Sequence, residues 1–386
     1  MLRSLYSGIS GLRAHQTMLD VTGNNIANVN TAGFKKSSTQ FQDTLSQVLR
    51  NSGLPQEQAG GTNPAQVGLG VQVAGIRTSF AQGSAQSTGN PTDLMLDGDG
   101  FFVVSKGGQT TYTRAGAFSF DSAGRLTTAD GALVQGWSAV NGVVNTGGPL
   151  GGIRLPVDAT SPAVATTGAH VKGNLPGNVA DGESIVREIE VYDETGASTQ
   201  LTLTFTKTAA GWDVTDGAVT TSLAFTDGKQ TAASSLTTAD GITVDLSDIT
   251  GYADLRTVVI DNQNGSAAGT LTSYQIGADG ALVGAFSNGA TQVLAQIAVA
   301  NFDNPEGLEK VGSSQYRVGV NSGVPVIGVP GEDGAARLIS GALEMSNVDL
   351  SEEFTNLIVA QRGFQSNARV ITTSDEVLQE VTNLKR

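Results

Sequence analysis

Apolar residues repeat in alternating steps of three and four at both ends of this 386-residue chain. The N-terminal series consists of Leu2, Leu5, Ile9, Leu12, Gln16, Leu19, Gly23 and Ile26. The C-terminal series consists of Leu350, Phe354, Leu357, Gln361, Phe364, Ala368, Ile371, Asp375 and Leu378. This spacing is typical of a helix that packs against another helix. The sequence therefore predicts a long amphipathic helix at each end.

The C-terminal helix also carries start and stop signals. Asp349 and Glu352 have the spacing of an N-cap and the third helical residue of a capping box. Acidic Glu352 and Glu353 in the first turn and basic Lys385 and Arg386 at the close suit the helix dipole. We therefore expect this helix to begin directly after Asp349.

Glycines interrupt both predicted helices, at Gly8, Gly11, Gly23 and Gly363. Each glycine costs a helix about 1 kcal/mol relative to alanine. Two interpretations follow. The helices either pack on their own domain, or they stay disordered in the monomer and fold when neighbouring subunits supply apolar surface.

Between the helices the pattern changes to short β-prone runs separated by turn signals. The runs lie at 94–105, 110–114, 117–120, 188–192, 200–206, 257–260, 271–276, 293–302 and 315–320. The composition, with 50 glycines and only 15% charged residues, agrees with many strands joined by tight turns. The predicted fold class is mostly β with α-helical termini, in which the two terminal helices pair as a coiled coil.

Two glycine-rich stretches, 146–152 and 286–290, mark crossings between domains. If the terminal helices pair, the β blocks beside them also meet, and the block between the crossings becomes a nested domain. Segment 51–70 has few large apolar residues, so we expect it to be irregular and to order only against partners. The predicted domains are an N-terminal coiled-coil helix (1–30), an irregular connector (31–74), a discontinuous inner β domain (75–150 and 290–345), a nested outer β domain (151–289) and a C-terminal coiled-coil helix (346–386).

The charge and residue inventory exclude several classes of function. A formal net charge of −14 disfavours binding to nucleic acid or to an anionic membrane surface. Without cysteine there are no disulfides, thiolate nucleophiles or sulfur-ligated metals. The start of the chain lacks the apolar region of a secretory signal, and no run of about 18 apolar residues suggests a membrane span. Export of an unfolded chain without signal cleavage would leave the same trace.

Candidate chemical motifs are weak. His15 and His170 are the only histidines, too few for a histidine-rich metal site, and no nucleophile elbow occurs. The run Asp97-Gly98-Asp99-Gly100 lacks the remaining oxygen ligands of a calcium loop and fits a turn between strands better. We therefore expect no catalytic residues, no metal and no cofactor.

The segment that follows the first helix resembles the N-terminal signature of the axial proteins of the bacterial flagellum, the rod and hook subunits. The residues that carry this resemblance are Asn24, Asn25, Ala27, Asn28, Asn30, Thr31, Gly33 and Phe34. Residues 341–350 and 359–368 are similar to the C-terminal signature of the same family. Segments 274–280 and 293–308 resemble the return of hook proteins into their inner domain.

The resemblance implies a structural subunit of the flagellar hook, an extracellular curved tube that acts as a universal joint and transmits motor torque. It implies a homopolymer that meets a distal rod protein, a hook cap protein, a hook–filament junction protein and the flagellar export apparatus. The terminal helices would form the inner tube. The polymerisation interface would then comprise Leu2, Leu5, Ile9, Leu12, Leu19, Ile26, Leu350, Phe354, Leu357, Gln361, Phe364, Ile371 and Leu378.

Two alternatives stay open at the sequence level. The long connector at 51–70 is similar to the extra segment that stiffens the distal rod, so a distal rod subunit is one alternative. An extracellular carbohydrate-binding or adhesin-like β protein is the other. That class favours exposed aromatic residues, whereas aromatic residues make up only 5% of this chain.

Overall fold

The computed structural model describes residues 2–54, 60–140, 142–156, 158–231, 234–332 and 335–384, without the side chain of Leu2. The predicted basic helix end at Lys385 and Arg386 and residues 55–59 of the predicted connector lie outside these ranges. The chain divides into two compact units. The first unit comprises Met1–Leu155, Gln275–Leu282 and Val293–Arg386, and the second comprises Pro156–Tyr274 and Val283–Gln292.

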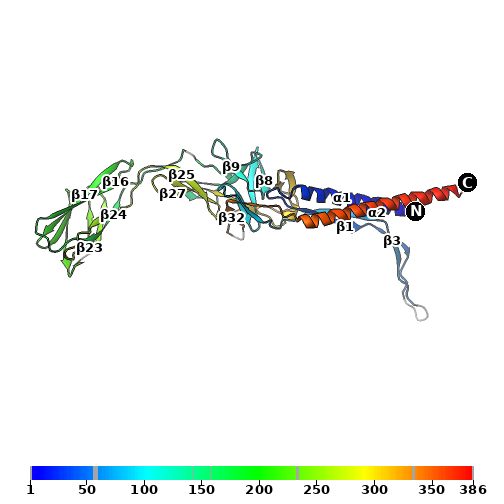
Figure 1. Ribbon diagram of the computed structural model, residues 1–386, viewed down its shortest axis with the longest axis horizontal. Coiled ribbons are helices and arrows are strands. Elements are labelled where there is room, and N and C mark those ends of the chain that lie inside the picture. The colour runs from blue at the N-terminus through cyan, green and yellow to red at the C-terminus, as the bar shows by residue number, and fades with distance from the viewer. Residues whose placement is uncertain are drawn as a thin grey trace. The chain divides into compact units, whose positions relative to one another are not determined.

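Both ends of the chain form helices, α1 over Leu2–Ala27 and α2 over Leu350–Asn383. The two helices lie side by side and run antiparallel, so that the N- and C-termini meet at one end of the pair (Figure 1). Helix α2 begins where the sequence predicts. The side chain of Asp349 accepts hydrogen bonds from the backbone N–H groups of Ser351 and Glu352, at 2.8 and 3.2 Å. The predicted pairing of helical termini is confirmed.

Segment 31–74 holds strands, whereas the sequence led us to expect an irregular connector. Strand β1 (Ser37–Asp43) pairs antiparallel with β4 (Val71–Thr78), and β2 (Ser46–Arg50) pairs with β3 (Ala65–Gly68). Strands β1 and β4 also pack along α1. The expectation relied on the scarcity of large apolar side chains. A two-stranded ladder satisfies its backbone groups without them, and most side chains of these strands are exposed.

The inner β unit follows this segment and closes before α2. Its elements are β5 (Ala85–Ser87), β6 (Leu94–Asp97), β7 (Phe101–Lys106), β8 (Gln109–Thr113), β9 (Phe118–Phe120), β10 (Leu126–Thr128), β11 (Leu133–Val140), β12 (Val143–Val144), β13 (Gly151–Gly152), β28 (Val299–Asn301), η1 (Pro305–Gly307), β29 (Glu309–Gly312), β30 (Gln315–Arg317), β31 (Val326–Gly328), β32 (Arg337–Ser340) and β33 (Ala342–Glu344). Strand β7 is central and pairs with β8, β11 and β28. Pairs such as β32 with β6 and β33 with β5 join the returning chain to its beginning.

Aromatic side chains fill the core of this inner unit. Phe101 makes edge contacts with Phe80, Phe302 and Tyr316 at ring-centroid separations of 5.4 to 5.9 Å. Such edge-to-face pairs contribute about 0.5–1.5 kcal/mol beyond the area that they bury. The core therefore takes residues from both chain passes, 80–112 and 298–316, which holds the two passes together.

The second unit is all-β. Its strands are β14 (Thr160–Ser161), β15 (Gly168–Asn174), β16 (Ser184–Tyr192), β17 (Ser198–Thr208), β18 (Gly211–Thr215), β19 (Thr220–Leu223), β20 (Phe225–Thr226), β21 (Lys229–Gln230), β22 (Ser235–Thr237), β23 (Thr243–Thr250) and β24 (Val259–Gln263). A four-stranded sheet β16-β17-β18-β19 and another, β22-β23-β15-β24, share one hydrophobic core, which includes Val171, Phe205 and Trp212. The strands that cross between the units are β25 (Gly269–Ile276), β26 (Ala281–Phe286) and β27 (Thr291–Ile297). That residues 151–289 fold autonomously stays a prediction.

Candidate assembly interface and its junction with the inner unit

The closest contact between α1 and α2 is made by small and polar residues. A Cβ added to Gly8 would lie 3.2 Å from Cγ1 of Ile371, and one added to Gly11 would lie 2.7 Å from the side-chain oxygen of Asn367. Near the helix ends, the hydroxyl groups of Ser4 and Ser374 lie 3.5 Å apart. Gly8 and Gly11, which we counted as helix-weakening, therefore allow this close approach, whereas a Cβ at Gly23 would meet nothing within 4 Å. The spacing of these small residues, in steps of three and four, is the sequence signal that could have identified the contact face.

The predicted apolar series lies beside this contact line. In α1, the residues Leu5, Ile9, Leu12, Leu19 and Ile26 are partly buried. In α2, Leu357, Phe364, Ile371 and Leu378 are partly buried, whereas Leu350, Phe354 and Gln361 are exposed. The residues of α2 that the chain buries fully are Glu353 and Ala360. Pairing within one chain therefore uses only part of the predicted apolar series.

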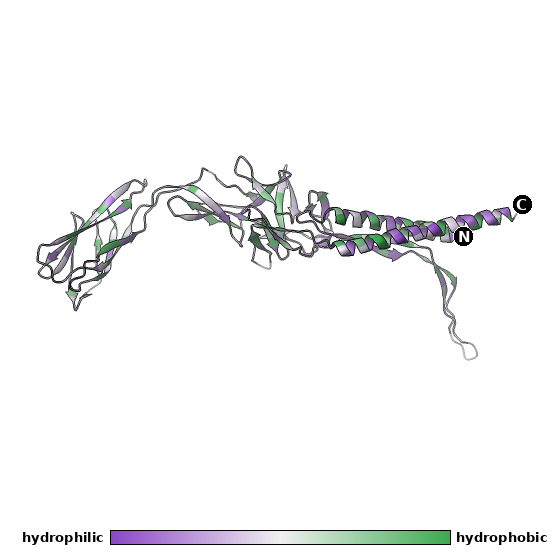
Figure 2. Cartoon of the chain, viewed as in Figure 1, coloured by the Kyte–Doolittle hydropathy of each residue, from purple (hydrophilic) through white to green (hydrophobic). Residues whose placement is uncertain are grey.

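Apolar side chains remain exposed along the length of α2. They are Leu350, Phe354, Ile358, Val359, Val370, Val377 and Val381. Phe354 is 50% exposed and Ile358 is likewise 50% exposed, one turn apart. Figure 2 shows hydrophobic and hydrophilic residues alternating along both helices. A single chain therefore leaves these apolar side chains of α2 without cover among the described residues, with Leu350, Phe354 and Ile358 on one side of the helix and the four valines on another.

The family-signature residues, which lie at the end of α1 and just beyond it, act through local geometry. Asn25 bonds Ser37 twice, with Oδ1 accepting from its N–H at 3.0 Å and Nδ2 donating to its carbonyl at 2.7 Å. Gly33 has φ +68°, and its N–H donates to the carbonyl of Glu344 at 2.8 Å. A Cβ there would lie 2.4 Å from the backbone nitrogen of Ala115, so only glycine fits.

The other signature residues end α1 and line its exit. Asn28 donates to Asn24 Oδ1 at 2.8 Å and accepts from the hydroxyl of Thr31 at 3.1 Å. Phe34 lies under the ammonium group of Lys310, 5.4 Å from the ring centroid. Ala27 and Asn30 are exposed. The signature thus shapes a turn that delivers the chain from α1 to the inner unit.

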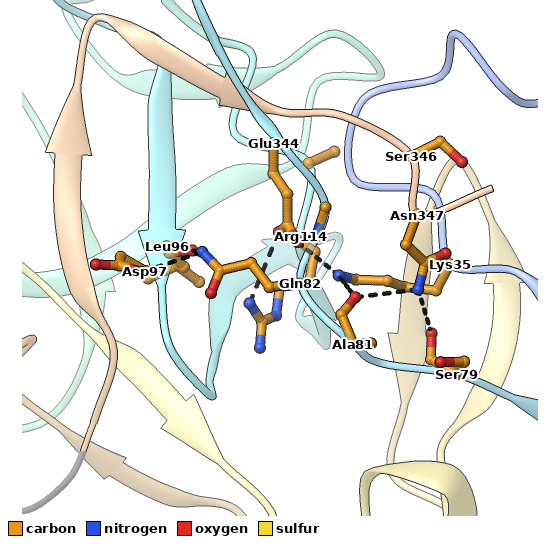
Figure 3. Close-up of polar contacts among 12 residues, drawn as sticks. Lys35, Ser79, Ala81, Gln82, Leu96, Asp97, Arg114, Glu344, Ser346 and Asn347 are labelled. Carbon is orange, nitrogen blue, oxygen red and sulfur yellow. Dashed lines mark hydrogen bonds and ion pairs between the residues drawn. The ribbon is translucent and has the colours of Figure 1, made fainter. Parts of the chain in front are cut away.

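A buried charge cluster, Lys35, Glu344 and Arg114, lies where this turn meets the inner unit (Figure 3). Lys35 Nζ lies 2.6 Å from Glu344 Oε1, and both side chains are fully buried. Arg114 Nη1 lies 3.7 Å from Glu344 Oε2, and its guanidinium stacks 5.3 Å from the centroid of Phe101. No pattern in the sequence indicates this cluster, because its members are 79 to 309 residues apart.

Backbone groups complete the shell around the cluster. Lys35 Nζ donates to the carbonyl of Ala81 at 2.8 Å, and the N–H of Gly83 donates to Glu344 Oε1 at 2.9 Å. Burial is the largest influence on both cations, and it lowers the pKa of Lys35 and that of Arg114, while the charge of Glu344 opposes the shift. The carboxylate of Glu344 therefore stabilises the charged forms of Lys35 and Arg114 in their buried positions.

Asn347 and the ion pair between Lys36 and Glu352 lie beside the buried cluster. The Oδ1 atom of Asn347 accepts from the N–H of Lys36 at 2.8 Å, and its Nδ2 donates to the carbonyls of Ser79 and Ala81. Figure 3 shows Asn347 beside Lys35 and Ser79. Outside this shell, Lys36 pairs with Glu352 at 2.8 Å. The chain entering α2 is thus tied to the chain leaving α1.

The candidate ligand motifs give no metal site within the described ranges. No group of three or more His, Asp or Glu side chains there could hold a metal ion. Asp97 ends β6, Phe101 begins β7, and the glycines between them adopt positive φ, so this run is a turn. His170 pairs with Asp248, and His15 packs against Gly363. In the described part of the chain, no helix is both long and apolar enough to span a membrane.

Comparison with known proteins agrees with these observations. Three family profiles match: "Flagella basal body rod protein" over residues 5–35, "Flagellar hook protein FlgE/F/G D1 domain" over 95–171 and "Flagellar basal body rod FlgEFG protein C-terminal" over 339–384. The first and third profiles cover the signature segments beside the two helices. The buried charge cluster takes one residue from each profile, since Lys35, Arg114 and Glu344 fall in the first, second and third.

Several relatives match along their whole length. The flagellar hook protein FlgE of Treponema pallidum is 37% identical, with 100% of both chains covered. The FlgE of Salmonella typhimurium is 35% identical over 99% of this chain and 100% of its own, and the flagellar basal-body rod protein FlgG of Bacillus subtilis is 36% identical over 100% of both. The chain therefore belongs to the flagellar hook protein family, whose members are structural proteins of the bacterial flagellum.

Proposed function

We propose that this chain polymerises into a curved tube, the flagellar hook, which acts as a universal joint between motor and filament. The observation that carries the proposal is the set of apolar side chains on α2 that the helix pair leaves exposed, from Leu350 to Val381. Burying one such side chain stabilises a contact by about 1.5–3 kcal/mol. Neighbouring copies of the same helix can supply the apolar surface that buries it. The hook is an extracellular part of the flagellum, and the family self-assembles within that structure.

The division of the chain suggests how torque and bending are separated. The paired helices form the inner tube and carry torque, because their apolar faces give the tightest contacts between subunits. The β units form outer layers whose many Gly, Ser, Thr and Asn side chains make weak polar contacts that can slide. The role is mechanical, and we propose no catalytic activity for the chain.

The proposed partners follow from a position between rod and filament. The chain meets further copies of itself, the distal rod protein below, and the hook–filament junction protein above. The hook cap protein covers the growing end, and the flagellar export apparatus delivers each subunit unfolded. A distal rod role is the second candidate, because a rod protein FlgG is also matched over the full chain and because β3, within segment 51–70, pairs antiparallel with β2 just before that segment.

Electron microscopy of the purified full-length chain under polymerising conditions tests the proposal. We expect short curved tubes, whereas straight and stiff tubes would support the rod role. The variant Phe354→Asp places a carboxylate on the exposed apolar face and should abolish tubes, since it costs several kcal/mol to desolvate. The control Phe354→Leu keeps the face apolar and should form tubes. Normal tubes from Phe354→Asp would show that this face lies outside the subunit contacts.

A further inference from the structure

The buried charge cluster contains two cations and one carboxylate. Lys35 and Glu344 are fully buried, and the Arg114 side chain is only 2% exposed. Nε and Nη1 of Arg114 and Oε2 of Glu344 have no hydrogen-bond partner among the described residues, although Nη1 and Oε2 form an ion pair at 3.7 Å. Glu344 is therefore the carboxylate that pairs with both buried cations, and the exposed Asp99 adds a weaker favourable charge.

The three members come from three separate parts of the chain. Lys35 follows α1, Arg114 directly follows β8 in the inner unit, and Glu344 ends β33 shortly before α2. The N–H of Gly33 also donates to the carbonyl of Glu344, so residue 344 binds the N-terminal segment through both its backbone and its side chain. The cluster can therefore close only when both ends of the chain lie on the inner unit.

We infer that Glu344 is a positioning residue whose carboxylate couples the ordering of the two chain ends, so that α1 and α2 dock on the inner unit together. A chain with only its N-terminal end docked would bury Lys35 and Arg114 without their carboxylate. Buried charges without a partner are strongly unfavourable, so this half-docked state is depleted. A chain with only its C-terminal end docked keeps Glu344 paired with Arg114 but loses the ion pair to Lys35. This coupling goes beyond the proposed assembly, and only the measurements made on tubes rest on that assembly.

The number of charges in the cluster predicts that replacing Glu344 and replacing Lys35 have unequal effects. Replacing Glu344 with glutamine removes the carboxylate that pairs with both buried cations and leaves them only the charge of the exposed Asp99. Replacing Lys35 with methionine leaves Arg114 paired with Glu344, one charge against one. Loss of Glu344 should therefore disturb both ends far more than loss of Lys35, although each change breaks the same 2.6 Å ion pair.

Amine labelling of the full chain tests whether the cluster closes. Lys36 is the internal control, because it neighbours Lys35 in sequence but its side chain is 25% exposed. A small acetylating reagent is applied to monomer and to tubes, and the reaction of each lysine is followed by mass spectrometry. We expect Lys35 to react about 100-fold more slowly than Lys36 wherever the ends are ordered, and Glu344→Gln to bring the two within a few-fold. Equal rates in both monomer and tubes of the parent chain would overturn the inference.

Hydrogen exchange of the two helices tests the coupling. Glu344→Gln should lower the protection of α1 and α2 alike by about 100-fold, and Lys35→Met by no more than about 10-fold. Asp97→Asn is the matched control, because Asp97 is an exposed carboxylate near the cluster that accepts from Gln82, and both helices should keep their protection. A loss confined to α2 in Glu344→Gln would overturn the coupling. If Lys35 is protected from acetylation but the chain forms no tubes, the proposed function is refuted and the coupling still stands.

Discussion

His15 of α1 lies directly against Gly363 of α2, so that a Cβ added to Gly363 would sit 2.5 Å from Cε1 of the imidazole ring. The contact belongs to the same line as Gly8 and Gly11, where the two helices approach most closely. The same ring lies 5.9 Å from the ring of Phe41 on β1, which limits its room to move. A larger residue at position 363 would therefore have to displace the His15 ring.

The first prediction is that Gly363→Val weakens the pairing of α1 and α2 by about 1–3 kcal/mol, the usual cost of overpacking. A gain of a few tenths of a kcal/mol in helix propensity does not offset it. The matched control is Gly23→Ala, since a Cβ at Gly23 meets nothing within 4 Å and should stabilise α1 by up to about 1 kcal/mol. Hydrogen exchange across both helices, in tubes, measures the two effects. Equal protection in the two variants would refute this account of the contact.

The positions of the helices could be predicted from sequence because apolar periodicity and the Asp349 cap are local signals. The contact face could not, because the chain uses Gly8, Gly11 and Gly363 for close approach and turns large side chains such as Phe354 outward. Apolar spacing in steps of three and four selects residues that face outward as readily as residues that face the partner helix. The Lys35–Glu344 ion pair could not be predicted from the sequence for another reason. Its two residues are 309 positions apart, and neither belongs to a local sequence pattern.

The second prediction is that the second unit, which comprises Pro156–Tyr274 and Val283–Gln292, folds autonomously. Ser161 and Gly269 are opposed residues in the β14–β25 pair, so replacing residues 162–268 with a short glycine turn joins two adjacent strands. The excised segment contains the whole buried core of this unit, from Ala169 to Ile260, and none of the core of the inner unit. Calorimetry should show one cooperative melt in the shortened chain and another in the isolated segment. Absence of a cooperative melt in the shortened chain would show that the units depend on each other.

The third prediction concerns Tyr316, whose pKa burial raises to about 12 from an ordinary value of 10.0. Above pH 10 the unfolded chain loses this proton while the folded chain keeps it, so the folded state binds more protons and stability falls as pH rises. The loss between about pH 10 and 12 approaches 2–3 kcal/mol. Absorbance of tyrosinate, compared between the parent and Tyr316→Phe, should reveal one tyrosine that ionises near 12. Stability that declines equally in both chains over this range would contradict the assignment.

The fourth prediction is that Leu357→Asp blocks tube formation but leaves the β units intact. Leu357 is partly buried on α2, one turn after buried Glu353 and near buried Ala360, so an aspartate there lies beside an existing carboxylate. Desolvating it in the packed tube costs several kcal/mol in every subunit.

The two hydrophobic clusters described for the β units, around Phe205 and around Phe101, include no residue of α2, so the melts of these units should match those of the parent chain. Leu357→Met is the control, because it conserves volume and apolar character and should assemble normally. Sedimentation under polymerising conditions, beside calorimetry of the monomers, separates the two effects. Tubes from Leu357→Asp would put this side chain outside the subunit contacts. A collapsed monomer melt would instead show that α2 stabilises the β units, because only then could a change on the helix reach their cores.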